Sequence, residues 1–222
     1  MVCIVIPPCF LNFNPGQINK WRSGILLIYH RIKMHSIHQQ EISNTTRKIF
    51  IEPITTSAIS SVNQLVNSAY RGESSKAGWT TEADLLDGIR TSEESLTAMI
   101  ELPGGTMLLA KDVEQQLVGC VFLQVQHNKL YLGMLTVDPQ KQGLGIGKKL
   151  IQAAEQYGIT KKCDKVVMTV IDVRHELIAW YRKSGYLPTG EIKPFPNDPA
   201  FGIPRQPLQF VVLEKEIVAT PN

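Results

Sequence analysis

The feature that most constrains the fold of this chain is a glycine-rich turn between a strand-like run and an amphipathic segment. The apolar run 129–137 ends at Asp138-Pro139, and Gly143, Gly145 and Gly147 follow at alternate positions. Glycine allows the backbone to approach a ligand closely and to adopt positive φ angles. A helix that begins among these glycines would present unpaired N–H groups and the positive end of its dipole, which together favour a bound phosphate.

The charges next to this turn support an anionic ligand. Lys148 and Lys149 fall in the predicted first helical turn, where cations oppose the helix dipole unless an anion is bound. The alternative is a tight turn with two solvated lysines. Two familiar phosphate-binding patterns do not fit. GxxxxGK[ST] fails at Gln142 and again at Lys149, and GxGxxG fails because the glycines alternate.

The remaining pattern predicts one domain in which strands and helices are mixed along the chain. Strand-like runs are expected at 49–54, 106–111, 117–126, 129–137, 165–171, 186–192 and 208–217. Helical spacing occurs at 55–70, 145–157 and 175–184, and further helix starts are expected at Thr81 and Thr91. The connections between residues 106 and 137 are short and polar, which predicts an antiparallel meander. We therefore expect a mixed α/β (α+β) fold.

Composition excludes several classes of protein. With 43% hydrophobic and 19% charged residues, the chain can form a core and is neither disordered nor collagen-like. No run approaches the roughly 18 apolar residues of a membrane span. Four scattered cysteines without a CxxC pair predict neither a metal site nor a disulfide framework. We therefore expect a cytoplasmic protein with no metal and no membrane contact.

The N-terminal segment is predicted to lie outside the folded domain. Residues 1–33 hold four basic side chains and no acid, so they account for the net charge of +3 and leave the remainder nearly neutral. Nucleic-acid binding is therefore not expected. The predicted boundaries are an extension at 1–46, a domain at 47–217 and a tail at 218–222. The extension is either a flexible tail or the result of an upstream start codon before Met34.

Two motifs in this chain resemble those of the GNAT N-acetyltransferases. Val137-x-Pro139 followed by Gln142-x-x-Gly145-x-Gly147 is similar to the acyl-CoA-binding loop of that family. The segment Ala179-Trp180-Tyr181-Arg182-Lys183-Ser184-Gly185-Tyr186 is similar to the family's helix ending in Tyr-x-x-x-Gly-Phe/Tyr. The order of elements agrees over roughly three quarters of the chain. The resemblance implies a central, largely antiparallel sheet that is splayed at the acyl-CoA site and flanked by helices.

The resemblance also implies acetyl-CoA as cosubstrate, no metal, and direct attack of an amine on the thioester. The implied cofactor contacts are Leu135, Thr136 and Val137 on the strand and Gln142, Gly143, Leu144, Gly145, Ile146, Gly147 and Lys148 on the loop. Main-chain groups of Leu135 and Val137 would bind the pantetheine arm, and N–H groups of 142–148 the pyrophosphate. Tyr181 matches the family tyrosine that protonates the departing thiolate, and its alternative role is that of a core aromatic.

Two positions depart from the family pattern. Arg174 stands where many members carry an Asn seven residues before the tyrosine. The contact that this Asn makes with CoA is therefore not expected here, and the hypothesis in its place is a contact between Arg174 and a phosphate. The stretch 131–134 has no carboxylate where many members carry a Glu as general base. The candidates for that base, each otherwise a solvated charge or helix cap, are Glu73, Glu82, Asp84, His175 and Glu191.

The acceptor pocket is expected at 69–86 and in the loop 193–207, because the family varies there. The candidate substrate residues are Tyr70, Arg71, Trp79 and Glu82. Side chains that could receive a carboxylate of the acceptor, with surface solvation as the alternative, are Arg71, Lys76 and Arg205. Aromatic candidates for a lid are Phe195 and Phe201.

The expected activity is acetyl transfer to a primary amine of a small molecule or peptide, and a homodimer is compatible with the sequence. The rival interpretation is a non-catalytic acyl-CoA-binding module. The missing strand carboxylate favours this rival, whereas the presence of Tyr181 opposes it.

Overall fold

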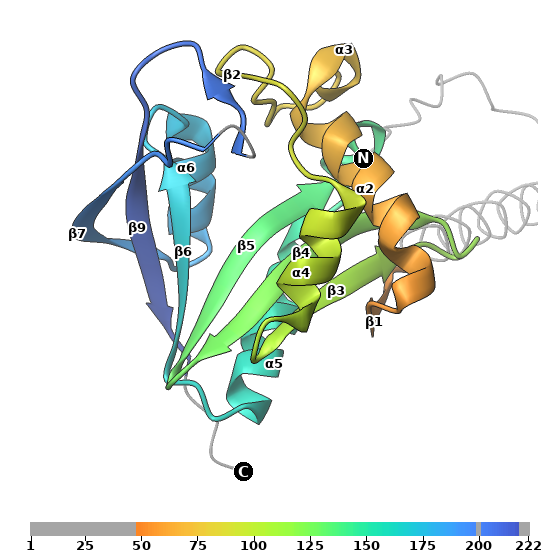
Figure 1. Ribbon diagram of the computed structural model, residues 1–222. Helices are drawn as coiled ribbons and strands as arrows, with labels where there is room; N and C mark the ends of the chain where they lie inside the picture. The colour runs from red at the N-terminus through yellow and green to blue at the C-terminus, as the bar shows by residue number, and fades with distance from the viewer. Residues whose placement is uncertain (1–47, 199–200, 218–222) are drawn as a thin grey trace, which may run out of the picture. The chain divides into compact units, whose positions relative to one another are not determined.

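The computed structural model describes residues 48–198 and 201–217, which form a seven-stranded sheet with helices on both faces (Figure 1). Its strands are β1 (Phe50–Pro53), β3 (Gly105–Lys111), β4 (Leu117–Gln126), β5 (Lys129–Val137), β6 (Lys165–Ile171), β7 (Leu187–Pro194) and β9 (Gln209–Glu216). The helices are α2 (Ile59–Tyr70), α3 (Gly72–Ser75), α4 (Glu93–Glu101), α5 (Ile146–Thr160) and α6 (His175–Lys183). Shorter elements are the 3-10 turns η1 (Thr56–Ala58) and η2 (Pro139–Lys141) and the paired strands β2 (Leu86–Asp87) and β8 (Ile203–Pro204). The mixed fold class predicted from the sequence is confirmed.

The sheet is antiparallel except at one place. Its strand order is β1-β3-β4-β5-β6-β9-β7, and only β5 and β6 are parallel neighbours. The meander predicted between residues 106 and 137 is present as β3, β4 and β5.

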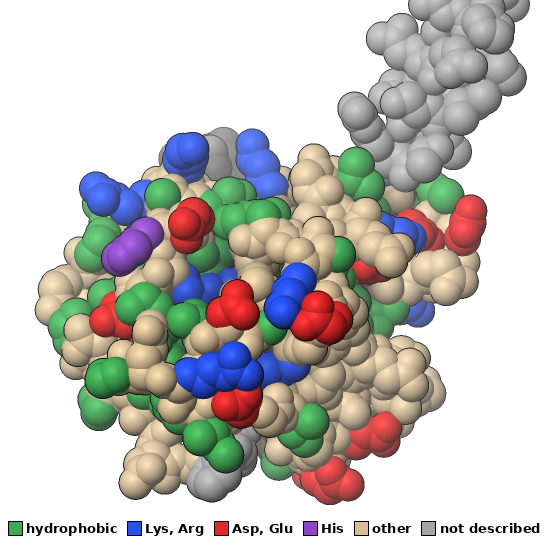
Figure 2. All heavy atoms as spheres, turned by 90° about the horizontal axis from the view of Figure 1, so that it is seen from above, with side chains coloured by type: hydrophobic (Ala, Val, Ile, Leu, Met, Phe, Trp, Pro, Cys, Tyr) green, Lys and Arg blue, Asp and Glu red, His purple; other side chains and the backbone are tan. Residues whose placement is uncertain are grey.

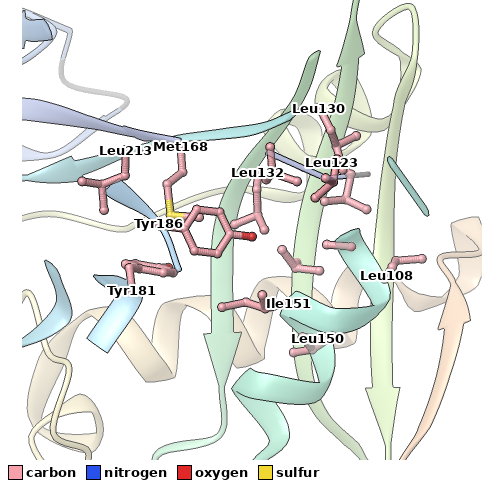
Figure 3. Close-up of a cluster of buried hydrophobic side chains, with 14 of the residues drawn as sticks. Leu108, Leu123, Leu130, Leu132, Leu150, Ile151, Met168, Tyr181, Tyr186 and Leu213 are labelled. Atoms are coloured by element: carbon pink, nitrogen blue, oxygen red, sulfur yellow. The ribbon is translucent and has the colours of Figure 1, made fainter. Parts of the chain in front are cut away.

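Two hydrophobic clusters hold the helices against opposite faces of the sheet. α5 packs on β3, β4 and β5, where its buried Leu150 and Ile151 join Leu130 and Tyr181 in the larger cluster (Figure 3). α2 and α4 cover the other face (Figure 1), and Val62 of α2 is fully buried there. Apolar residues at helical spacing, which predicted these helices, give each one its buried side.

The two parallel strands separate soon after they pair. β5 and β6 are in register at Lys129–Tyr131 and Lys165–Val167, and they make no further pairs (Figure 1). The Tyr131 hydroxyl and Thr169 Oγ1 lie 3.2 Å apart just beyond the last pair. Beyond this contact the carboxyl ends of the two strands diverge, which is the splay that the resemblance implied.

The helix start predicted at Thr81 is wrong. Thr81 Oγ1 accepts the Ala83 N–H at 3.0 Å, and the N–H groups of Leu85 and Leu86 both donate to the Glu82 carbonyl. These bonds form an isolated turn that leads directly into β2. The start predicted near Thr91 is confirmed, because Ser92 caps α4 by accepting the Ser95 N–H at 3.2 Å.

Some expectations concern residues that are not described. The extension 1–46, the start at Met34 and the tail 218–222 lie outside the described ranges, so the domain boundaries stay predictions. The predicted loop 193–207 contains β8, and the expected acceptor region 69–86 contains α3. No helix within 48–198 or 201–217 is long and apolar enough to cross a membrane.

Candidate functional site

The glycine-rich turn forms an open cradle in front of α5. Gly143 and Gly145 have φ angles of 78° and 80°, and Gly145 is the N-cap of the helix. A Cβ atom added at either position would meet no atom within 4 Å, so both glycines border open space. The first intrahelical bond runs from the Lys149 N–H to the Gly145 carbonyl at 3.1 Å. The N–H groups of the first turn, residues 146–148, therefore have no intrahelical acceptor and suit a pyrophosphate.

A cavity of about 360 Å³ extends from this cradle between β5 and α6. This volume falls in the range of small-molecule sites. Its lining residues are Tyr70, Trp79, Thr80, Leu135, Val137, Gln142, Gly143, Gly145, Ile146, Gly147, Lys148, Arg174, Leu177, Trp180 and Tyr181. Of the predicted cofactor contacts, Thr136 and Leu144 do not line it. Thr136 is buried and donates to the Met134 carbonyl at 3.1 Å, whereas Leu144 is 54% exposed.

A bulge in β5 turns the strand toward the cavity. Met134 has a φ of 48°, and the pairing with β4 shifts between Cys120 and Phe122. An extra residue in one strand changes which side chains face which way. Leu135 and Val137 consequently border the cavity, and the Leu135 carbonyl accepts a hydrogen bond from the Tyr70 hydroxyl at 2.9 Å.

Tyr181 lies where the cavity meets the hydrophobic core. Its ring centroid is 5.1 Å from that of Trp180. The Tyr186 ring, whose centroid is 6.0 Å away, lies next to it in the hydrophobic cluster (Figure 3). Burial raises the pKa of Tyr181 well above its ordinary value, and the nearby Tyr70 adds to this increase. The hydroxyl makes no hydrogen bond to another side chain or carbonyl among the described residues. Tyr181 is therefore a neutral phenol at physiological pH.

Two arginines hold one carboxylate beside the cavity. Glu82 accepts from Arg71 at 2.5 Å and from Arg174 at 2.9 Å, and all three side chains are buried. Arg174 also donates to the Thr80 carbonyl at 2.9 Å. Arg71 and Glu82, which we predicted as substrate residues, do not line the cavity, because their charged groups face each other. Their contacts instead fix the segment 80–82 against α2 and α6.

Gln142 connects this segment to the cradle. Its Oε1 accepts the Trp79 N–H at 2.9 Å, and its Nε2 lies 3.5 Å from Thr80 Oγ1. Gly78 passes so close that an added Cβ would be 2.8 Å from the Gln142 amide. At the other end of the cradle, an added Cβ at Gly147 would be 3.4 Å from the Trp180 ring. Gly78 and Gly147 thus allow neighbouring side chains to pack closely, whereas Gly143 and Gly145 border open space.

The other charged candidates are used in surface pairs. Lys76 pairs with Glu73, Arg205 with Asp87, and Lys193 with Glu191. Figure 2 looks down on the end of the sheet where β5 and β6 separate, and it shows acidic and basic side chains interspersed there. His175 and Asp84 are exposed. The lid candidate Phe195 instead stacks on Phe210 with ring centroids 5.3 Å apart, and Phe201 is 45% exposed.

Sequence reasoning missed four cavity residues as site residues or gave them another role. Thr80, Leu177 and Trp180 carried no recognisable signal, although Trp180 adjoins the second motif. Arg174 was expected to contact a phosphate, and the structure directs it toward Thr80 and Glu82. Within the described ranges, no three His, Cys, Asp or Glu side chains gather to form a metal site.

The splayed sheet, the glycine cradle at a helix N-terminus and the buried tyrosine agree with the fold that the sequence resemblance implied. Residues 65–186 match the sequence model described as the acetyltransferase (GNAT) family. The match covers more than half of the chain, and the chain therefore belongs to this family of N-acetyltransferases. A search of curated protein sequences found no significant match.

Solved structures of the same fold agree with this assignment. The ribosomal-protein-S18-alanine N-acetyltransferase from Escherichia coli has a TM-score of 0.59 at 13% identity, covering 78% of this chain and 97% of that chain. A GNAT-family acetyltransferase from Staphylococcus aureus has a TM-score of 0.55 at 19% identity, with coverages of 77% and 100%. A spermidine/spermine N-acetyltransferase from Vibrio cholerae has a TM-score of 0.54 at 15% identity, with coverages of 76% and 95%. At these identities the likeness concerns the fold.

Proposed function

We propose that this chain transfers the acetyl group of acetyl-CoA to a primary amine of a small molecule or peptide. The observation that carries the proposal is the single cavity that joins the glycine cradle, the edge of β5 and Tyr181. When bound, acetyl-CoA supplies the thioester from which the acetyl group is transferred. The residues of the cradle and strand would hold it, and Tyr181 would act on the reacting sulfur.

Cofactor binding is assigned mainly to backbone groups. The N–H groups of residues 142–148 would bind the pyrophosphate, with Lys148 adding a positive charge. The free edge of β5 at Leu135 and Val137 would bind the pantetheine arm as an added strand. The Leu135 carbonyl already accepts from Tyr70, but a carbonyl has two lone pairs and can accept a second bond.

Tyr181 is assigned the role of general acid. Direct attack of the amine forms the N–C bond and breaks the C–S bond, which leaves a thiolate that needs a proton. Burial raises the pKa of Tyr181, so its hydroxyl keeps a proton to donate. The absence of another partner for this hydroxyl among the described residues supports the assignment.

The experiment that tests this function measures CoA release and product formation together. Purified protein is incubated with acetyl-CoA and a panel of small amines and short peptides, and the acetylated amine is identified by mass spectrometry. We expect release of CoA that depends on both protein and amine. The rival, a non-catalytic acyl-CoA-binding module, is supported by the absence of any Asp or Glu among the described cavity residues. Tight acetyl-CoA binding without any acetylated product would establish the rival.

The setting of the reaction is proposed to be the cytoplasm. Cys120 and Cys163 are buried free thiols, which are typical of a reducing compartment. A homodimer remains part of the proposal, and light scattering during size-exclusion chromatography measures the oligomeric state. Fractionation of cells that express the tagged protein tests its location.

A further inference from the structure

The fixed charges that border the cavity are all of one sign. Its ionisable lining residues are Tyr70, Lys148, Arg174 and Tyr181, and no described lining residue is Asp or Glu. Burial raises the pKa of both tyrosines, so they carry no negative charge at neutral pH. Lys148 and Arg174 therefore set the sign of the electrostatic potential inside.

The two cations belong to different parts of the cavity. Lys148 lies in the first turn of α5, where a pyrophosphate would neutralise it. Arg174 instead donates to Thr80 and Glu82. It stands with Tyr70, Trp79 and Thr80 on a surface that we call the acceptor wall. The charge of Arg174 has no role in the proposed cofactor cradle.

Glu82 does not neutralise the acceptor wall. Its carboxylate lies between Arg71 and Arg174, and the three groups are buried. Two guanidinium groups and one carboxylate leave one positive charge in excess, and charge is poorly screened away from water. Arg90, whose guanidinium carbon is 5.3 Å from the centroid of the Tyr70 ring, adds another positive charge beside this wall.

The charge of Arg174 reaches the place where the reaction is proposed to occur. It opposes the effect of burial on the pKa of both Tyr70 and Tyr181, so it acts on two hydroxyl groups of the cavity. The other side chains there are largely aromatic. Trp79 is 51% exposed and lies 6.3 Å from Trp180 between ring centroids. Such surfaces favour an apolar or aromatic body over a hydrated chain of charges.

From these observations we infer the class of acceptor, an inference that rests on the proposed function. We propose that the acceptor wall selects a monoamine with an apolar or aromatic body and discriminates against diamines and polyamines. A second ammonium group would be repelled by the excess positive charge of Arg71, Arg174 and Glu82 taken together. The same charge favours the neutral form of the reacting amine, which is the nucleophile. An amine that binds neutral has left one proton in solvent. The second proton, which the nitrogen loses as the N–C bond forms, replaces the one that Tyr181 gives to the thiolate.

The test uses three acceptors with the same four-carbon chain: butylamine, putrescine and γ-aminobutyrate. They end, respectively, in a methyl group, a second ammonium and a carboxylate. We expect kcat/KM for putrescine to be lower than for butylamine by about ten-fold, the effect of roughly 1.4 kcal/mol of repulsion. We expect γ-aminobutyrate to be used at least as well as butylamine. Equal or faster use of putrescine would overturn the proposal.

Two arginine variants locate the origin of this selectivity. Arg174→Gln removes the excess charge and keeps groups that can bond to Thr80 and Glu82. The ratio of kcat/KM for butylamine to kcat/KM for putrescine should therefore fall toward one. The matched control is Arg205→Gln, since Arg205 pairs with Asp87 outside the cavity. The control should leave the ratio unchanged. Because the readout is a ratio of two substrates, a loss of stability alone does not change it. An unaltered ratio in Arg174→Gln would contradict the assignment.

The proposal on the acceptor class and the proposal on transferase activity would be refuted by different results. Binding of each amine to the protein–CoA complex is measured by isothermal titration calorimetry, which needs no chemical turnover. Preferential binding of putrescine overturns the acceptor class even if the protein is inactive. Acetyl-CoA binding with selective amine binding but no product overturns transferase function and leaves the acceptor wall supported. If none of the three amines binds, the assignment of the acceptor wall as the amine-binding surface is overturned.

Discussion

The hydroxyl of Tyr70 donates a hydrogen bond to the main-chain carbonyl of Leu135, with an O···O distance of 2.9 Å. This bond joins the last residue of α2 to the strand that borders the cavity, one position after the bulge at Met134. It therefore ties an acceptor-side helix to the strand edge proposed for the pantetheine arm. Apolar packing also holds α2 against β5, since Val62, Val66 and Met134 belong to one hydrophobic cluster.

Removing this hydroxyl tests its contribution. Tyr70→Phe keeps the ring and leaves the partly buried Leu135 carbonyl without this partner, so the free energy of unfolding should fall by about 1 kcal/mol. Urea denaturation measures the change. Tyr157→Phe is the control, because the Tyr157 ring is half-buried and its hydroxyl makes no hydrogen bond within the described residues. Equal stability of the two variants would show that the Tyr70 bond contributes nothing net.

The cradle is tested by two glycines with the same backbone conformation. Gly145 and Gly190 have φ angles of 80° and 86°, and an added Cβ meets no atom within 4 Å at either. Replacing either by Ala should cost about 1 kcal/mol of stability because both are left-handed. Only Gly145→Ala should weaken acetyl-CoA binding in calorimetry, and Gly145→Glu should weaken it further by repelling the pyrophosphate. Equal affinities for Gly145→Glu and Gly190→Ala would refute the pyrophosphate assignment.

Gln142 is expected to affect the acceptor more than the cofactor. Gln142→Ala removes the contact with the Trp79 N–H and frees the segment 79–80, so KM for the amine should rise several-fold. The dissociation constant of acetyl-CoA should change little, because backbone groups are proposed to hold it. Gly78→Ala pushes on the same amide from the other side and should have a similar effect.

The exposed Gln140 provides a control for this pair of variants. Gln140→Ala changes the same loop without touching the segment 79–80 and should leave both constants unchanged. Steady-state kinetics with varied amine at saturating acetyl-CoA gives the comparison. A loss of acetyl-CoA affinity as large as the change in KM would instead assign Gln142 to the cofactor.

Local pattern was enough to predict the seven strands of the large sheet and the glycine turn at the start of α5, but not the short pair β2 and β8. β5 and β6 have the predicted bounds because each is a β-rich run between turn residues, and the cradle follows from glycines at a helix start. The bulge at Met134 could not be predicted, because a methionine at positive φ leaves no signature in the sequence. Such a conformation is imposed by the surrounding sheet.

The ion network was beyond sequence reasoning for a different reason. Glu82 followed Thr81 in a pattern typical of a helix N-terminus, and its carboxylate was a candidate base. Its partners Arg71 and Arg174 lie 11 and 92 residues away along the chain. Only the folded chain brings these three charges together. Once paired, the carboxylate is neither a helix cap nor available to the acceptor.

Alkaline pH should destabilise the fold in a defined range. Burial raises the pKa of Cys120 from its ordinary value near 9 to about 12, and it also raises the pKa of Tyr181 and Tyr186. The unfolded chain therefore loses these protons at lower pH than the folded chain does. The free energy of unfolding should be unaffected by these groups below about pH 9 and should fall as pH rises toward 12, by up to about 1.4 kcal/mol per group and pH unit. Urea denaturation at several pH values measures this effect. The free energy of unfolding should fall less steeply with rising pH in Cys120→Ala than in the parent protein.

The last prediction concerns Tyr181, whose hydroxyl is assigned to the departing thiolate. Tyr181→Phe keeps the ring and its packing on Trp180 and Tyr186, so stability should change little. The single-turnover rate should fall by roughly 10²–10⁴, as for loss of a general acid, while acetyl-CoA affinity stays nearly constant. Tyr186→Phe is the matched control, because it breaks the bond from Tyr186 to Glu155 at 3.0 Å and should lower stability without slowing transfer. If Tyr181→Phe reacts at the parent rate, the thiolate takes its proton from water and Tyr181 serves only as a core aromatic.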